Sequence, residues 1–239
     1  MAALVFEGQG LHAIALILLL AGCFLLSRLP VFDTGALWGI ATRGWFWIAV
    51  GIAVTHQVYV WVCWRAQLHA QLLTRLLGPA AFPSYAVGFS ILGIARVVAV
   101  FLLAAAGAGT ATGVDPVVLR ALALVALAGA LYLFYSVKRY FTFKRAFGID
   151  HFDPSYRTMP MVKGGIFRFT ANGMYVYGFL LIWVPGLWSG AVAALVAALF
   201  NHLYIWVHYF ATERPDMRRI YGTPPPQMPS GGAGGPAGP

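Results

Sequence analysis

Residues that could do chemistry gather in two segments of an otherwise apolar chain. Residues 148–157 read GIDHFDPSYR, where Asp150 and Asp153 stand on either side of His151. Residues 202–222 read HLYIWVHYFATERPDMRRIYG and combine histidines, aromatic residues and a glutamate. Ionisable side chains are costly in a bilayer unless protein or water surrounds them. We therefore expect these two segments to meet and form one site.

His151 is the first candidate catalytic residue. Two acids near a histidine can orient its ring as a proton acceptor. The alternative is a solvated loop whose basic residues lie on the cytoplasmic side of a membrane. Two carboxylates and one histidine, with no further cluster, are a weak metal signal, so we expect no metal site.

The second segment predicts one face of a helix. Spacings of four, three and four align the side chains of His202, Trp206, Tyr209 and Glu213. Such a face in a membrane helix should point at a cavity, which makes His202 and Glu213 candidate catalytic residues. His208 lies on an adjacent stripe, for which hydrogen bonds between helices are the structural alternative.

The composition predicts an all-α polytopic membrane protein. Of 239 residues, 60% are hydrophobic and only 10% are charged, whereas about a quarter are charged in soluble domains. The formal charge of +9 comes from basic residues that flank apolar runs. This favours contact with anionic lipid headgroups and not with nucleic acid. Cys23 and Cys63 fall inside apolar runs, so we expect no disulfide framework.

Six membrane spans are expected from the apolar runs, with a turn at Pro185-Gly186 between the last two. Residues 1–137 would form a four-helix membrane region, and residues 138–222 a catalytic loop and a membrane hairpin. The tail, residues 223–239, is rich in Pro and Gly and is expected to be disordered. The expected spans are 11–26, 45–64, 82–106, 116–137, 174–184 and 188–209.

The distribution of Lys and Arg predicts the orientation. The loop at residues 138–170 carries seven basic residues and two acidic ones, and Arg65 and Arg75 are expected in the loop between spans two and three. Both termini and both polar segments should therefore face the cytoplasm. Glu7 stands where a signal peptide would be basic, which indicates a retained first helix. The Ala- and Gly-rich composition favours a bacterial inner membrane.

Two polar residues fall inside expected spans. Arg96 has no acid within any span, so it needs carbonyls, a histidine, water or a lipid phosphate. His56 is expected to be a hydrogen-bonded core histidine. Paired with His202 or His208, however, it leaves open a haem-binding electron carrier. A non-catalytic membrane scaffold also stays open. The sequence has no Walker, GxGxxG, HExxH, CxxC or GxSxG motif, which excludes recognisable nucleotide-driven pumps, zinc proteases and serine hydrolases.

Short motifs in a fixed order point to one family. They are Phe147-Gly148-Ile149, Asn172-Gly173-Met174-Tyr175, Glu213-Arg214-Pro215 and Ile220-Tyr221. Over residues 140–222 this pattern resembles the integral membrane methyltransferases, and phosphatidylethanolamine N-methyltransferases more closely than isoprenylcysteine carboxyl methyltransferases. The family pattern has a proline where Gly173 stands and a second glutamate where Arg214 stands.

The resemblance implies that S-adenosylmethionine is the methyl donor, held between the last helices and open to the cytosol. The acceptor would enter from the bilayer. The donor would contact Asn172, Tyr175, Gly178, His208, Glu213 and Arg214, with Arg214 pairing to a carboxylate. The lipid headgroup would contact Asp150, Tyr156, Arg157, Lys163 and Arg168, whose cations suit an anionic substrate.

The expected reaction is methyl transfer to the headgroup amine of phosphatidylethanolamine or of its monomethyl and dimethyl forms. An ammonium with a pKa near that of lysine, about 10.4, must lose its proton before it can attack. The candidate bases are His151, His202 and Glu213. A carboxylate or thiol on a hydrophobic substrate stays open as an alternative acceptor.

Overall fold

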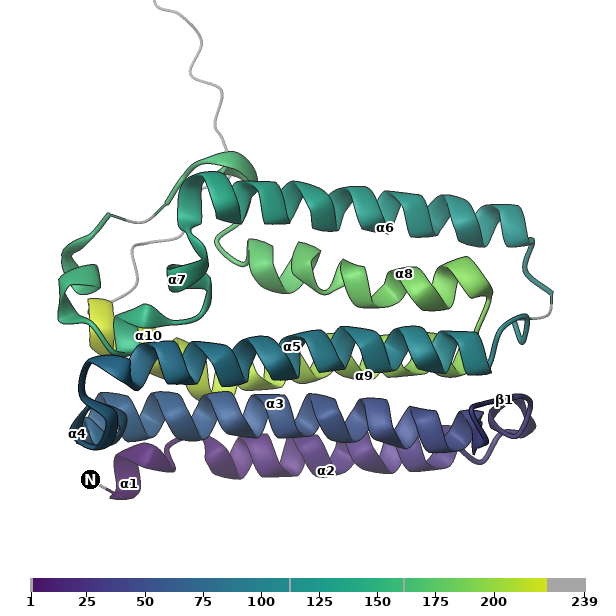
Figure 1. Cartoon of the computed structure of the whole chain (residues 1–239), viewed down its shortest axis with the longest axis horizontal. Helices are drawn as coiled ribbons and strands as arrows, with labels where there is room; N and C mark the ends of the chain where they lie inside the picture. Colours follow the sequence, from purple (N-terminus) through teal and green to yellow (C-terminus); the bar gives the residue numbers. More distant parts are fainter. Residues whose placement is uncertain (1, 112, 161, 223–239) are drawn as a thin grey trace, which may run out of the picture.

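The computed structural model describes residues 2–111, 113–160 and 162–222, and the predicted disordered tail lies outside them. The elements form a bundle of helices whose long axes lie side by side (Figure 1). Within the described residues, the strands are two of two residues each, which pair as one short hairpin. The elements are α1 (Ala2–Val5), α2 (Gln9–Leu26), β1 (Ala36–Leu37), β2 (Ile40–Ala41), α3 (Thr42–Ala70), α4 (Leu72–Leu77), α5 (Ala81–Ala106), α6 (Pro116–Ser136), α7 (Phe143–Ala146), α8 (Leu180–Ser189), α9 (Val192–His208) and α10 (Arg214–Tyr221).

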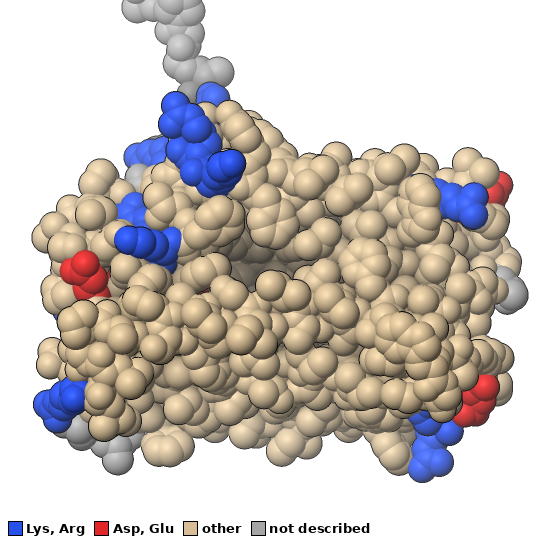
Figure 2. All heavy atoms as spheres, in the orientation of Figure 1, with Lys and Arg blue, Asp and Glu red and all other residues tan. Residues whose placement is uncertain are grey.

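The predicted all-α polytopic membrane bundle is confirmed. Within the described residues, five helical stretches are long and apolar enough to cross a membrane, and the shorter apolar stretch Met174–Ser189 joins them. Figure 2 shows Lys, Arg, Asp and Glu at the two ends of the visible face and none across its middle. The five long stretches are Gln9–Leu26, Thr42–Ala70, Leu72–Ala106, Pro116–Phe141 and Val192–Tyr221.

The predicted turn at Pro185-Gly186 is wrong. Helix α8 continues through both residues, and the chain turns at Gly190, whose φ of 61° is left-handed. Proline is tolerated inside membrane helices because neighbouring groups satisfy the freed carbonyl. Gly186 serves packing instead, since a Cβ there would lie 3.0 Å from the backbone nitrogen of Leu195 on α9.

The helices pack in a simple order. α3 contacts α5 and α9, while α8 lies between α6 on one side and α5 and α9 on the other. Small residues on α9 let these helices approach closely. They are Ala193, Ala194, Ala197 and Ala198, all almost fully buried.

One end of the bundle carries the polar elements. α1, α4, α7 and α10 gather there, while the β1–β2 hairpin lies at the opposite end (Figure 1). In the described part of the chain, three helices contain a π-helical turn at this polar end: η3 (Val137–Phe141), η7 (Met174–Gly178) and η8 (Tyr209–Glu213). Single π turns occur often at functional sites, because they redirect side chains.

Candidate active site

A cavity of about 630 Å³ opens among α3, α5, α6, α8 and α9 toward the polar end of the bundle. Most of its walls are apolar, and its volume falls in the range of about 300–1,000 Å³ that is usual for ligand sites. Figure 2 shows a hollow on this face between α5 and α6. The cavity is therefore the first candidate for a binding site.

The cavity brings together four of the predicted donor-binding residues: Tyr175, Gly178, His208 and Glu213. All three π turns contribute to its lining, through Val137 of η3, through η7 and through Glu213 of η8. Further polar side chains in the lining are His56, Gln57, Trp64, Ser90 and Arg96.

The predicted face holds in part. The rings of Trp206 and Tyr209 pack on Tyr175 and that of His202 packs on Phe179, but the π turn η8 changes the helical repeat before Glu213. Because a π turn spans five residues, Glu213 lies about one turn beyond His208 on a similar side of the helix. Both residues line the cavity. His202 accepts a hydrogen bond from Trp183 Nε1 at 3.1 Å and is not among the lining residues. Its catalytic role stays a prediction without support from its position.

Several buried polar atoms of the lining lack partners. Among the described residues, no hydrogen bond satisfies either ring nitrogen of His56 or His208, or the indole nitrogen of Trp64. An unsatisfied buried polar group costs about 1–3 kcal/mol. A polar ligand in the cavity would satisfy these groups.

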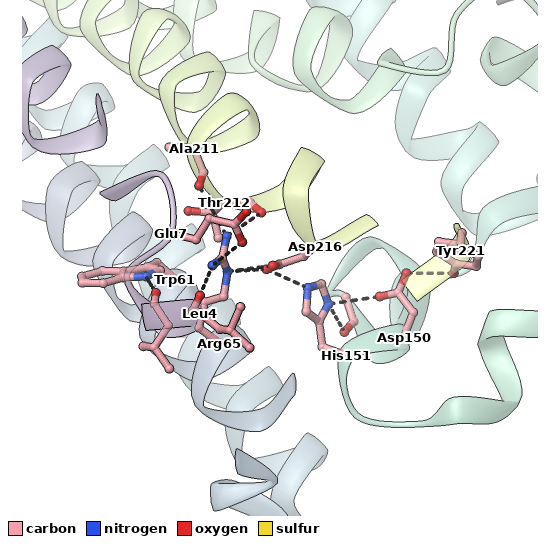
Figure 3. A network of polar contacts seen from close by, with 12 residues as sticks. Leu4, Glu7, Trp61, Arg65, Asp150, His151, Ala211, Thr212, Asp216 and Tyr221 are labelled. Carbon is pink, nitrogen blue, oxygen red and sulfur yellow. Dashed lines mark hydrogen bonds and ion pairs between the residues drawn. The ribbon is translucent and has the colours of Figure 1, made fainter. Parts of the chain in front are cut away.

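Figure 3 shows a second polar cluster, which adjoins the cavity through the stack of His151 on Trp64. Arg65 Nε lies 2.7 and 2.9 Å from the two carboxylate oxygens of Asp216, and both side chains are fully buried. The guanidinium also donates to the backbone oxygens of Leu4, Ala211 and Thr212. The prediction that Arg65 lies in a loop is wrong, since it belongs to α3. A buried guanidinium is tolerated there because a carboxylate and carbonyls surround it.

His151 belongs to this second cluster. Its Nδ1 lies 3.3 Å from Asp150 and its Nε2 lies 3.5 Å from Asp216. Tyr221 donates to the other Asp150 oxygen at 2.9 Å. The polar loop and the C-terminal segment therefore meet, as predicted. We call the five residues Arg65, Asp150, His151, Asp216 and Tyr221 the buried network.

The charges of the buried network set the protonation of His151. Burial lowers the pKa of His151, but the carboxylates of Asp150 and Asp216 outweigh it and raise the pKa to about 9. Burial raises the pKa of Asp150, yet its bonds to His151 and Tyr221 bring it below the usual value. With a proton on each ring nitrogen, His151 is a poor base at neutral pH. Its ring stacks on that of Trp64, with 4.2 Å between the ring centroids, and Trp64 in turn lines the cavity.

Asp153 does not bracket His151 as predicted. Its carboxylate accepts a hydrogen bond from the backbone nitrogen of Ser155 at 2.9 Å, which caps the 3-10 helix η5 (Pro154–Thr158) and lowers the pKa of Asp153. Asp216 supplies the second acid instead. Sequence spacing could not reveal this, because Asp216 comes from a different segment.

The other predicted donor-binding residues lie outside the cavity lining. Asn172 is half-buried, and its backbone nitrogen donates to the Thr170 hydroxyl at 3.1 Å. Arg214 is exposed, with its guanidinium 5.9 Å from the Phe210 ring.

The predicted headgroup residues are scattered over the polar end. Lys163 and Arg168 are exposed, and Tyr156 is half-buried with the Arg145 guanidinium 6.0 Å from its ring. Arg157 is exposed and shares with His151 a small pocket of about 120 Å³. The large cavity is lined by none of these described side chains.

Trp64 was missed in the sequence, although it touches both the cavity and His151. Its position at the end of an apolar run marks only the interface end of a span, where tryptophan is common, and nothing in the sequence shows that its indole faces a cavity.

Comparison with known proteins agrees with the motifs. The model of the phospholipid methyltransferase family matches residues 118–224, which confirms the family resemblance of this part of the chain. No curated protein and no solved structure matches the chain. The matched segment supplies Tyr175, Gly178, His208 and Glu213 to the cavity, whereas α3 and α5 lie outside it. Residues 118–224, somewhat less than half of the chain, are thus similar to the phospholipid methyltransferase family.

Proposed function

We propose that the protein transfers methyl groups from S-adenosylmethionine to the headgroup amine of phosphatidylethanolamine, or of its monomethyl and dimethyl forms. One observation carries this proposal. The cavity joins polar residues of the family domain to an apolar opening between α5 and α6. A lipid headgroup can enter such a cavity from the side while its acyl chains stay among apolar residues.

The lining suits the donor. Glu213 offers a carboxylate, and His208 and Trp64 offer ring nitrogens that lack partners among the described residues. Gly178 lets η7 pack closely against Leu133 of α6 in the cavity wall, since a Cβ at residue 178 would lie 2.9 Å from a methyl of Leu133. When bound, S-adenosylmethionine supplies a methyl group on a positively charged sulfur. Contacts from Asn172 and Arg214 stay predictions, because neither residue lines the cavity.

Glu213 is the base that the geometry favours. Of the three predicted bases, it alone belongs to the described lining of the cavity. Its carboxylate attracts the headgroup ammonium and accepts one of its protons. In an apolar cavity this transfer replaces two charged groups by two neutral ones, which lowers the desolvation cost. The walls then hold the free amine in line with the methyl group and exclude water.

The polar end is proposed to face the cytoplasm. It carries the loop with seven basic residues and the three arginines of α10. Cytoplasmic loops are enriched in Lys and Arg. The donor would then enter from the cytoplasm and the lipid from the bilayer.

The test is a product analysis by mass spectrometry. Purified protein in nanodiscs of phosphatidylethanolamine receives a donor with a deuterated methyl group, and calorimetry measures donor binding in parallel. The proposal predicts monomethyl, dimethyl or trimethyl lipid. Donor binding without a lipid product would move the acceptor to a carboxylate or thiol. Absence of donor binding would contradict the methyltransferase itself.

A haem-binding electron carrier is the second candidate. His56 and His208 both line the cavity, and the described residues leave both of their rings without hydrogen bonds. Such histidines could serve as axial ligands. A visible absorption band in the purified protein would support this candidate, and a colourless protein that binds the donor would contradict it.

A further inference from the structure

The cavity contains a guanidinium without a counter-ion at its inner end, away from the polar elements. Arg96 of α5 is only 3% exposed and belongs to the lining. It donates to the side chain and to the backbone oxygen of Asn201, and it lies 4.9 Å from the Phe179 ring. Within the described residues, no carboxylate forms an ion pair with it. A buried charge is costly unless an opposite charge accompanies it.

His56 of α3 adds a second orphaned group at this end. It is almost completely buried, it lines the cavity, and neither ring nitrogen has a partner among the described side chains and backbone groups. Eight residues, or about 12 Å of helix, separate it from Trp64 at the polar end. The inner end of the cavity thus offers hydrogen-bond donors. At the polar end, Glu213 is the carboxylate among the described lining residues.

The direction of α5 brings the Arg96 charge toward Glu213. Side chains of an α-helix tilt toward its N-terminus, and α5 begins at the polar end (Figure 1). Ile94 and Val98, two residues to either side of Arg96, line the cavity and are 65% and 46% exposed. Residues two apart on a helix do not share a face, so Arg96 points into the bundle while Ile94 and Val98 form an apolar rim at the outer edge of the same cavity.

We propose that Arg96 and His56 bind the phosphodiester of a membrane lipid in this cavity. The headgroup then extends toward Glu213, and the acyl chains leave over Ile94 and Val98 between α5 and α6. A guanidinium and a phosphate make paired, charge-assisted hydrogen bonds. The assignment of this lipid as methyl acceptor rests on the proposed function, whereas the binding itself does not.

The consequence is that the N-terminal helices, which lie outside the matched family segment, select the acceptor. The family segment supplies Tyr175, His208 and Glu213 to the same cavity. Recognition of the phosphodiester and handling of the amine are thereby divided between two parts of the chain.

The experiment compares three lipids with identical acyl chains and no methyl donor. Native mass spectrometry measures binding of phosphatidylethanolamine, of phosphatidylglycerol, which has the phosphodiester but no amine, and of diacylglycerol, which has neither. We expect both phospholipids to bind about tenfold more tightly than diacylglycerol, the size of one charge-assisted bond. Arg96→Gln should remove this preference, and Arg96→Lys should retain part of it. Arg120→Gln, at an exposed arginine of α6, is the matched control and should keep it.

Two results would overturn the proposal. One is wild-type protein that binds diacylglycerol as tightly as phosphatidylglycerol, which needs no variant to fold. The other is a folded Arg96→Gln variant with the preference intact. If Arg96→Gln does not fold, His56→Gln must weaken the preference. A wild-type protein that shows the lipid preference but transfers no methyl group would contradict only the proposed function.

Discussion

Trp64 lies between the cavity and the buried network, but the polar groups of the two regions differ in whether they have partners. In the network, Arg65, Asp216 and His151 are fully buried and lie against opposite charges. In the cavity, His56 and His208 lack partners among the described groups. Removal of one member of a buried charge pair strongly destabilises a structure, whereas a buried polar group without a partner beside open space is suited to bind a polar ligand. The difference separates a region that supports the structure from the region proposed to hold the ligand, although both carry histidines and carboxylates.

The largest effect should come from Asp216→Ala in the buried network. It removes the fully buried carboxylate that lies against both Arg65 and His151, and leaves Arg65 with Glu7 at 3.9 Å and His151 with Asp150 at 3.3 Å. The free energy of unfolding should therefore fall by about 3–5 kcal/mol. Denaturation in detergent, followed by tryptophan fluorescence, measures it. Asp33→Ala is the matched control, because it breaks an exposed ion pair with Arg43 and should cost less than about 1 kcal/mol. Equal losses in the two variants would contradict the role of the network.

Glu213→Gln should act on the reaction and not on stability. Without a proton acceptor, methyl transfer should slow by about 10²–10⁴-fold, while the free energy of unfolding stays the same. Turnover is measured by mass spectrometry of the lipid. Asp33→Asn is the control, because this aspartate is exposed and pairs with the surface residue Arg43. Full activity of Glu213→Gln would remove the carboxylate from the mechanism.

The pH dependence of stability should report His151. Its pKa of about 9 in the folded protein lies above the ordinary 6.5, so folding favours the charged ring. This contribution is complete below about pH 6.5 and is lost as the pH rises through about 9, a change on the order of 3 kcal/mol. Unfolding curves from pH 6 to 10 measure it, and His151→Gln should flatten them. An unchanged pH slope in His151→Gln would show that the ring is not charged.

His202→Gln should have the smallest effect. His202 lies outside the cavity lining and bonds only to Trp183 among the described residues. Hydrogen bonds between membrane helices average about 0.6 kcal/mol, so turnover should change less than about threefold. A loss as large as that of Glu213→Gln would restore His202 as the base.

The sequence predicted the membrane bundle and the family, because both depend on local patterns. Apolar runs indicate the spans, and the motif around Glu213 can be recognised from a few consecutive residues. The same short motifs placed Tyr175 and Glu213 among the candidate residues, the helical stripe added His208, and all three line the cavity.

The sequence could not predict what depends on non-local packing. The π turn η8 changes which side chains lie on the same side of the helix as Glu213, and no pattern of residues in the sequence predicts this turn. The partner of Arg65 is 151 positions away in Asp216. Spacing made His151 a base, whereas its carboxylate neighbours keep it protonated.

Filling the cavity tests most directly whether methyl transfer happens there. Gly93 lines the cavity, and a Cβ at this residue would lie 3.6 Å from His56, an ordinary contact. Gly93→Leu therefore occupies the inner end, and Gly22→Leu, on the open side of α2 with nothing within 4 Å, is its control. The measurement is deuterated methyl transfer to phosphatidylethanolamine in nanodiscs. We predict methylated lipid from the wild type and Gly22→Leu, and little or none from a folded Gly93→Leu. Equal product from Gly93→Leu, or no methylated lipid from the wild type, would contradict the account.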